Sequence, residues 1–278
     1  MGMKSYKPYT PSRRHMTVAD YSMLTKVEPW KPLLKNLPPK SGRNSAGRIT
    51  VRHQGGGVKR LYREVDFSQM KLNVPGRVET LEYDPYRTAF IARIVYKDGA
   101  RTYVLAPEKM KVGDEIITAD QASLTTGNRM KLKNIPLGYQ VYNVELQPNG
   151  DGKLARSAGS YVEVLAHEDG NTNLKMASGE IRRVSWDCFA SIGQVSNAEH
   201  NLVTIGKAGR SRHLGIRPTV RQSVMNPVDA PYGGGEGKQK RGTKRPKTIW
   251  GKVTGGRKTR NRKKWTNTFI IQRRPNNR

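Results

Sequence analysis

Two glycine-rich stretches have the composition of loops that bind nucleotide phosphates. They cover residues 42–48 and 233–238. A nucleotide-binding loop requires a lysine followed by a serine or threonine whose hydroxyl reaches magnesium. The first stretch ends in an arginine and is followed by Ile49, while the second is one residue too short and is followed by Gln239. We therefore reject a nucleotide-hydrolysing site at both stretches.

Cys188 is the single cysteine of the chain and stands next to Asp187. No histidine is adjacent to it in sequence, although His167 or His200 could approach it in the fold. We favour a buried structural thiol over a nucleophile. One cysteine forms no intramolecular disulfide and no cysteine-based zinc site, and His53 has no second ligand nearby. We predict no enzyme, no catalytic residue and no metal-binding residue.

Positive charge is concentrated at the two ends of the chain. The 278 residues include 51 Lys and Arg against 22 Asp and Glu, which gives a formal net charge of +29. Residues 1–64 carry 14 basic and 3 acidic side chains, residues 65–206 carry 16 and 17, and residues 207–278 carry 21 and 2. Basic segments rich in Gly, Pro and Asn cannot bury enough apolar surface to fold alone. We expect a folded body with two cationic extensions that bind nucleic acid.

The body contains short β-branched and aromatic runs that are separated by turn residues. In residues 65–125 we expect strands at 77–83, 88–96, 101–106 and 112–117. In residues 126–205 we expect strands at 139–146, 161–167, 173–176, 181–184 and 193–195. No strong helix separates the strands, which argues against a parallel sheet. The predicted fold is all-β: an oligonucleotide-binding-type barrel, then an SH3-like barrel, with long irregular basic extensions at residues 1–64 and 206–278.

Individual residues of the body have expected roles. The barrel interiors or their lining should contain Phe90, Ile91, Ile94, Val95, Val141, Val144, Val162 and Val164, with Trp186 and Phe189 packed at the end of the second barrel. Single surface charges are usually only solvated, so we rank five body residues below the extensions as RNA contacts: Arg77, Arg87, Arg129, Lys131 and Lys133. A short helix is expected around residues 17–24, with Thr17 as its cap.

Residues 226–237 combine prolines and glycines without an apolar period, so they cannot form a packed helix or a central strand. We expect folded nucleic acid to hold this segment, because bare glycine backbone can approach phosphates and base edges closely. The residues predicted to contact RNA are Arg13, Arg14, His15, Arg43, Arg48, Arg52, His53, Gly55, Gly56, Gly57, Lys59, Arg60, Arg63, Lys207, Arg210, Arg212, His213, Arg217, Arg221, Asn226, Asp229, Tyr232, Gly233, Gly234, Gly235, Lys238, Lys240, Arg241, Lys244, Arg245, Trp250, Arg257, Lys258, Arg260, Arg262, Lys263, Lys264, Arg273 and Arg274.

The N-terminal residues contain no apolar segment like that of a secretory signal. No run approaches the roughly 18 to 20 apolar residues that a membrane span requires. We therefore expect a soluble protein of a reducing compartment, with no membrane partner.

Several sequence motifs distributed along the chain resemble those of a single protein family. The clearest are residues 217–221 and 225–229 followed by Gly233-Gly234-Gly235, and they are supported in order by residues 14–17, 55–60, 134–138, 154–159, 178–180 and 206–210. With these motifs the chain resembles the universal large-subunit ribosomal protein two family in its bacterial or organellar form. The resemblance covers essentially the whole chain.

That resemblance implies a structural constituent of the large ribosomal subunit with an oligonucleotide-binding barrel and an SH3-like barrel. It implies a primary binder of large-subunit rRNA that helps assemble the peptidyl transferase centre, supports tRNA binding and contributes to subunit association. The implied partners are large-subunit rRNA, other large-subunit ribosomal proteins, small-subunit rRNA at an intersubunit bridge, and nearby tRNA. No cofactor is implied, although structural magnesium could be shared with rRNA. A cytoplasmic ribosome is the expected location, and an organellar ribosome stays open.

The chain departs from the family at one motif. The family commonly has His-Pro-His before the triple glycine, whereas this chain has Ala230 and Tyr232 at the two histidine positions. Ala230 has no group that titrates or donates a proton, so a direct role of this position in peptide-bond chemistry does not apply here. Tyr232 is limited to hydrogen bonding or stacking.

A free nucleic-acid chaperone or DNA-compacting protein is the main alternative. Neutralisation of phosphates is blind to sequence and largely to the sugar, so charge alone does not exclude it. An enzyme is the third class, and the weak candidates at Cys188 and at the glycine-rich stretches disfavour it.

Overall fold

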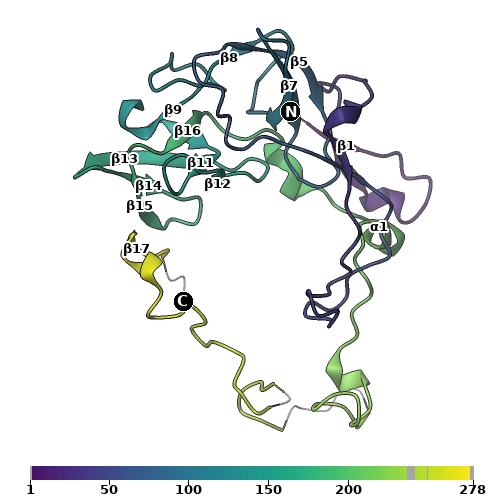
Figure 1. The fold of residues 1–278 in the computed structure, drawn as a ribbon. Coiled ribbons are helices and arrows are strands. Elements are labelled where there is room, and N and C mark those ends of the chain that lie inside the picture. The colour runs from purple at the N-terminus through teal and green to yellow at the C-terminus, as the bar shows by residue number, and fades with distance from the viewer. Residues whose placement is uncertain (1, 237–241, 249, 276–278) are drawn as a thin grey trace. The chain divides into compact units, whose positions relative to one another are not determined.

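The computed structural model describes residues 2–236, 242–248 and 250–275. Nearly all of its regular structure is β-strand (Figure 1), which confirms the predicted fold class. Over those ranges the α-helical content is one short helix, α1 (Ala208–His213), and the 3₁₀ turns are η1 (Arg13–His15), η2 (Lys31–Leu33), η3 (Leu132–Asn134), η4 (Ala198–Leu202), η5 (Gln222–Val224) and η6 (Trp265–Asn267). None of the helices in the described part of the chain has the length and apolar composition needed to cross a membrane.

The chain forms two compact units. Unit 1 comprises Met1–Pro38, Lys59–Ala208 and Thr268–Arg278, and unit 2 comprises Pro39–Val58 and Gly209–Asn267. The chain leaves unit 1 twice and returns to it twice. Both basic extensions therefore contribute to unit 2.

The first barrel of unit 1 is built on a four-stranded antiparallel sheet in the order β7-β6-β5-β8. These strands are β5 (Gly76–Glu82), β6 (Ile91–Tyr96), β7 (Arg101–Leu105) and β8 (Glu115–Ile116). Because side chains alternate between the two faces of a strand, Ala92, Ile94 and Tyr96 of β6 point into one core with Val78 and Val104. The expected oligonucleotide-binding-type barrel is confirmed, with β8 shorter than the predicted strand.

The second barrel contains a seven-stranded sheet in the order β17-β15-β14-β13-β10-β16-β9 and a separate pair, β11 and β12. Their bounds are β9 (Arg129–Lys131), β10 (Gln140–Tyr142), β11 (Val144–Glu145), β12 (Gly152–Leu154), β13 (Val162–Glu168), β14 (Asn171–Lys175), β15 (Ile181–Ser185), β16 (Phe189–Ile192) and β17 (Ile270–Gln272). Its core includes Met130, Val141, Val164, Leu174 and Cys188, all of them buried. The SH3-like barrel is confirmed, and its edge strand β17 comes from the end of the chain.

Two short antiparallel pairs lie outside the barrel sheets in unit 1. Strand β1 (Met3–Ser5) pairs with β2 (Thr17–Ala19), and β3 (Leu34–Asn36) pairs with β4 (Leu61–Arg63). The helix expected around residues 17–24 is therefore wrong. Pairing with β1 and the hydrogen bond from the Thr17 N–H to the Thr204 carbonyl, at 3.1 Å, hold this segment extended.

Two other expectations for the body need correction. The strand expected at residues 193–195 lies instead at β16, because Gly193 has φ +114° and ends the extended run. Arg129, expected as a surface charge, is fully buried on β9. Of the residues expected inside the barrels, Val95 is half-buried and the others are buried; Phe189 is also buried, whereas Trp186 is exposed.

Unit 2 joins a segment of the N-terminal extension to one of the C-terminal extension. The Gly55 N–H donates to the Gly215 carbonyl at 2.8 Å, and the Val58 N–H donates to the His213 carbonyl at 3.0 Å. The Arg217 N–H donates to the His53 carbonyl at 2.9 Å. Segments about 160 residues apart in sequence therefore pair through their backbones.

Candidate nucleic-acid interface

The outer face of strands β6 and β7 corresponds to the surface on which oligonucleotide-binding barrels usually hold their ligand. In this chain Ile91 and Tyr103 on that face are 0% exposed and pack against Val65 and Leu33. The backbone N–H of Trp30 donates to the Tyr103 hydroxyl at 2.9 Å. The chain's own N-terminal segments therefore cover this face.

Charged residues beside Trp30 are also engaged within the protein. The guanidinium carbons of Arg93 and Arg101 lie 5.8 Å and 4.7 Å from the centre of a Trp30 ring. Both arginines donate to Glu79 Oε2, at 2.8 Å and 3.3 Å. An oligonucleotide would have to displace Trp30 and this ion-pair network to reach the usual face of the barrel.

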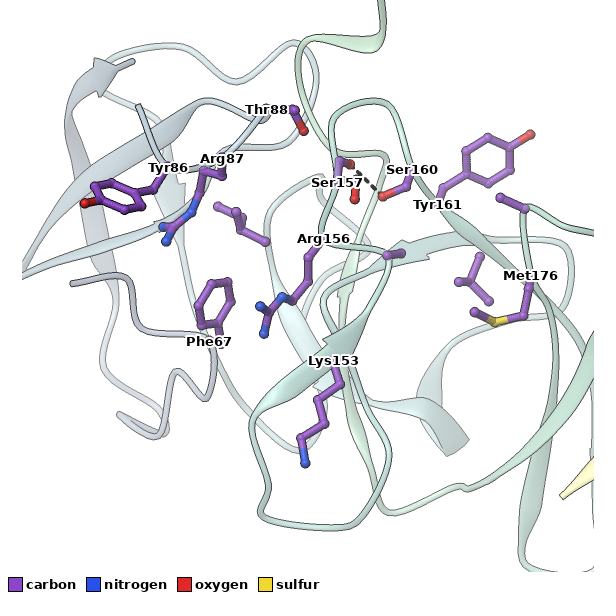
Figure 2. Close-up of a pocket in the computed structure, with 14 residues that line it drawn as sticks. Phe67, Tyr86, Arg87, Thr88, Lys153, Arg156, Ser157, Ser160, Tyr161 and Met176 are labelled. Atoms are coloured by element: carbon purple, nitrogen blue, oxygen red, sulfur yellow. Dashed lines mark hydrogen bonds between the residues drawn. The ribbon is translucent and has the colours of Figure 1, made fainter. Parts of the chain in front are cut away.

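A basic pocket lies where the two barrels of unit 1 meet (Figure 2). Its volume is about 660 Å³, and it is lined by Phe67, Tyr86, Arg87, Thr88, Leu105, Lys153, Ala155, Arg156, Ser157, Ser160, Tyr161, Val162, Met176 and Ala177. The lining, taken from the described part of the chain, contains three cationic side chains and no carboxylate. A concave site with this charge favours an anionic ligand.

Phe67 holds an arginine from each barrel at this pocket. The guanidinium carbon of Arg156 lies 3.9 Å from the centre of the Phe67 ring, and that of Arg87 lies 5.4 Å from it. The Phe67 carbonyl accepts hydrogen bonds from the Asn143 side chain at 3.0 Å and the Gly152 N–H at 3.2 Å. Phe67 therefore links residues of the first barrel to the second.

The aromatic and cationic contacts continue outward from the pocket. The guanidinium of Arg87 lies 5.6 Å from the Tyr62 ring, Tyr62 meets Tyr86 edge-to-face at 5.4 Å, and Arg60 lies 4.6 Å from the Tyr86 ring. Arg60 is a predicted RNA contact, whereas Arg87 was ranked lower and Arg156 was not among the predicted sites. The one sequence signal for Arg156 is its place in residues 154–159, one of the motifs that resemble the family.

Arg87 is held in place by contacts within the protein. Its Nη1 lies 3.0 Å from Oδ2 of the fully buried Asp84, as an ion pair whose angle is not that of a hydrogen bond. Asp84 Oδ1 accepts the Tyr86 N–H at 2.8 Å, which fixes the carboxylate. Because Asp84 offsets the charge of Arg87, the exposed side chains Lys153 and Arg156 supply the excess positive charge of the pocket.

The predicted RNA contacts are divided between the two units. Unit 1 contains Arg13, Arg14, His15, Lys59, Arg60, Arg63, Lys207, Arg273 and Arg274. Unit 2 contains Arg43, Arg48, Arg52, His53, Gly55, Gly56, Gly57, Arg210, Arg212, His213, Arg217, Arg221, Asn226, Asp229, Tyr232, Gly233, Gly234, Gly235, Lys244, Arg245, Trp250, Arg257, Lys258, Arg260, Arg262, Lys263 and Lys264. Lys238, Lys240 and Arg241 lie outside the described residues.

Two of the predicted glycines have a role inside the protein. A Cβ on Gly57 would lie 3.0 Å from the Gly215 Cα, and a Cβ on Gly233 would lie 2.3 Å from the Asn226 carbonyl oxygen. A side chain at Gly233 would collide with this backbone, and one at Gly57 would press against the backbone of Gly215. The contact of Gly57 and Gly233 with RNA stays a prediction. The close approach of the backbone is a separate reason for glycine at these two positions.

The loop with the departure from the family is tied to a later part of unit 2. The Tyr232 hydroxyl accepts the Lys247 N–H at 2.6 Å and lies 3.4 Å from the Thr243 hydroxyl. Ala230 is buried, while Val228 at the tip of the loop is 90% exposed. Tyr232 therefore positions two segments of the extension, which is within the hydrogen-bonding role expected for it.

The candidates for catalysis and metal binding have structural contacts. Cys188 is fully buried, and burial raises the pKa of its thiol to about 12. Both ring nitrogens of His167 are engaged, at 2.9 Å from the Thr172 hydroxyl and 2.9 Å from the Ile135 carbonyl. Within the described ranges no three His, Cys, Asp or Glu side chains are placed to share a metal ion.

Two small antiparallel barrels, a basic pocket where they meet and long cationic extensions define a nucleic-acid-binding protein of the two-barrel class. Residues 30–118 match the family described as Ribosomal Proteins L2, RNA binding N-terminal domain, and residues 125–251 match Ribosomal Proteins L2, C-terminal domain. The chain belongs to the ribosomal protein L2 family. It is accordingly a structural RNA-binding protein of the large ribosomal subunit, and the resemblance found in its motifs is confirmed.

Proposed function

We propose that this protein is a primary binder of large-subunit rRNA, helps assemble the peptidyl transferase region, and supports tRNA binding and subunit association. Its further partners would be other large-subunit ribosomal proteins, small-subunit rRNA at an intersubunit bridge, and nearby tRNA. No cofactor of its own is required, and structural magnesium would be shared with rRNA phosphates. The protein contributes position and stiffness, because Ala230 offers no group for proton transfer.

The observation that carries this proposal is the convergence of Arg87 and Arg156 on Phe67. One arginine comes from each barrel, so RNA bound here would bridge them. Arginine suits this role because its planar guanidinium can stack on a ring and pair with phosphate at the same time. The covered face of β6 and β7 favours this pocket as the RNA contact of unit 1.

The extensions supply the remaining affinity. Unit 2 has a backbone shaped by close glycine crossings and carries most of the predicted cationic contacts. Each phosphate that a Lys or Arg neutralises releases counterions, so affinity should fall by decades over a modest rise in salt.

Reconstitution of large subunits from parts lacking this protein tests the proposal. Wild-type protein should restore particles that keep it through a high-salt wash, and the Arg87→Gln/Arg156→Gln variant should be lost from them. Lys109→Gln, an exchange of a body cation outside the pocket, is the matched control. Retention of the double variant equal to wild type would refute the pocket as an rRNA contact.

A second measurement separates this function from that of a free nucleic-acid chaperone. Affinity for a structured fragment of large-subunit RNA is compared with affinity for random duplex DNA at equal salt. A ribosomal binder should prefer the RNA fragment by orders of magnitude, because only the fragment has the shape that both barrels and unit 2 fit. Equal affinities would favour the chaperone.

A further inference from the structure

We propose that the pocket where the two barrels meet takes one unpaired nucleotide of RNA, with its base on the free face of the Arg156 guanidinium. This inference rests on the proposed function of the same pocket as an rRNA contact. It adds the chemical class of the ligand, an unstacked nucleotide in place of a paired helix.

Arg156 is built as a stacking platform. The guanidinium carbon of Arg156 lies over the Phe67 ring, 3.9 Å from its centre, and Arg156 Nη1 donates to the Gly152 carbonyl at 3.0 Å. Arg156 is exposed and lines the pocket, and Phe67 occupies one side of its guanidinium, so a base would have to stack on the other side. Unpaired RNA bases are commonly recognised by stacking on arginine guanidinium planes.

The two sides of the pocket differ in chemistry. Figure 2 shows Arg87 and Phe67 on one side, with Arg156 and Lys153 between them and the Met176 side chain, which points toward the cavity from the other side. The apolar residues Val162 and Ala177 line the cavity together with Met176. A base has apolar faces and a phosphate is anionic, so a nucleotide matches a cavity that is lined by cations together with a thioether and aliphatic groups.

Hydroxyl groups at the rim offer contacts to the sugar or the edge of a base. Ser157 and Thr88 are exposed and line the pocket. The backbone around them is fixed, because the Ser160 hydroxyl donates to the Ser157 carbonyl at 2.6 Å and the Ala158 N–H donates to the Thr88 hydroxyl at 3.1 Å. A ribose 2′-hydroxyl both donates and accepts, so serine and threonine hydroxyls can distinguish RNA from DNA here.

The size of the cavity also favours a single nucleotide. A volume of about 660 Å³ lies within the range of sites that enclose small-molecule ligands, about 300 to 1,000 Å³. Paired bases stay stacked inside their helix and present only edges and backbone. A duplex would therefore meet Lys153 and Arg156 at the mouth and leave the interior of the pocket empty.

The test uses the full-length protein and two RNA hairpins of one sequence, one fully paired and one with a single bulged nucleotide. Wild-type protein should bind the bulged hairpin about tenfold more tightly, the order expected from stacking one base. Arg156→Lys keeps the charge but loses the planar face, so it should abolish this preference and leave affinity for the paired hairpin unchanged. Lys153→Gln, the matched control, should weaken both hairpins by the same factor. Unchanged thermal midpoints would show that the variants fold.

The outcomes separate this inference from the function on which it rests. Equal weakening of both hairpins by Arg156→Lys, or equal wild-type affinities for them, would overturn the unpaired nucleotide and leave the pocket as a phosphate contact. No effect of Arg156→Lys or Lys153→Gln on either hairpin would overturn both the nucleotide and the pocket as an RNA site.

Discussion

The guanidinium of Arg129 donates a hydrogen bond to Glu145 Oε1 at 2.7 Å, and neither side chain is exposed. Arg129 Nη1 also donates to the Asn143 carbonyl at 2.7 Å, and Glu145 Oε2 accepts the Phe189 N–H at 3.1 Å. Burial lowers the pKa of Arg129 and raises that of Glu145, because each charge has left water, while their pairing opposes both changes. The pair joins β9, β11 and β16 inside the second barrel.

Glu145→Leu should therefore destabilise the protein by about 3–5 kcal/mol, since it leaves a buried guanidinium without its partner. The double variant Arg129→Met/Glu145→Leu should recover most of this loss, because two apolar side chains remove both buried charges. Urea unfolding of the full chain measures the difference. The exposed pair Lys175 and Glu163 is the control, and Glu163→Gln should change stability by less than about 1 kcal/mol. A double variant as unstable as Glu145→Leu would contradict this account.

Gly233→Ala should disturb the loop that holds Tyr232. The new Cβ would lie 2.3 Å from the Asn226 carbonyl oxygen and 2.7 Å from that of Met225, so the backbone must shift. An overpacked site of this kind costs about 1–3 kcal/mol. In the complex with large-subunit rRNA, the Gly234 amide of Gly233→Ala should exchange hydrogen faster than that of the wild-type protein. Gly209→Ala is the control, because nothing lies within 4 Å of its Cβ, and its exchange should be that of wild type. If the Gly234 amide exchanged at the same rate in Gly233→Ala and Gly209→Ala, the backbone at Gly233 would not be as close to Asn226 as the structure has it.

Alkaline pH should unfold unit 1 through its buried tyrosines. Burial raises the pKa of Tyr103 from 10.0 to about 12, and burial also raises the pKa values of Tyr96 and Tyr142. Between pH 10 and 12 the unfolded chain loses a proton that folded Tyr103 retains. Stability is therefore unaffected below pH 10 and falls with rising pH above it, by about 1.4 kcal/mol per pH unit for this group.

Tyrosinate absorbance and far-ultraviolet circular dichroism, followed together during the titration, check this expectation. Tyr96, Tyr103 and Tyr142 should ionise only as the strands unfold. Tyr103→Phe should reduce the loss of stability over the same pH range. Full ionisation of all 12 tyrosines while the strands remain intact would be incompatible with this arrangement.

Cys188 should react slowly with a thiol reagent in the native protein. It is fully buried, and the raised pKa of its thiol leaves almost no thiolate at neutral pH. Labelling should become fast in denaturant, with one thiol modified per chain. Ser157→Cys, at an exposed position, provides the comparison and should be labelled at once in the native state. Fast native labelling of Cys188 would reopen the case for a reactive thiol.

The sequence was sufficient for features that depend on local patterns. Apolar alternation and intervening turn residues placed β5, β6 and β7 within a few residues, because strand periodicity and turn chemistry depend on neighbouring residues. Charge counts separated the neutral body from the basic extensions for the same reason. The motifs around Gly233 were specific enough to indicate the family.

Tertiary structure alone decided which distant side chains meet. Arg129 has the local appearance of a surface charge, and it is buried because Glu145 lies across the barrel. The pocket exists because packing of the two barrels brings Arg156 beside Phe67, 89 positions earlier in the chain. The backbone of Gly57 lies against that of Gly215 because two distant segments pair, and no local sequence pattern predicts this pairing. Such contacts depend on how whole elements pack, so composition and spacing identified the class of ligand, while the folded chain determined which side chains line the pocket of unit 1.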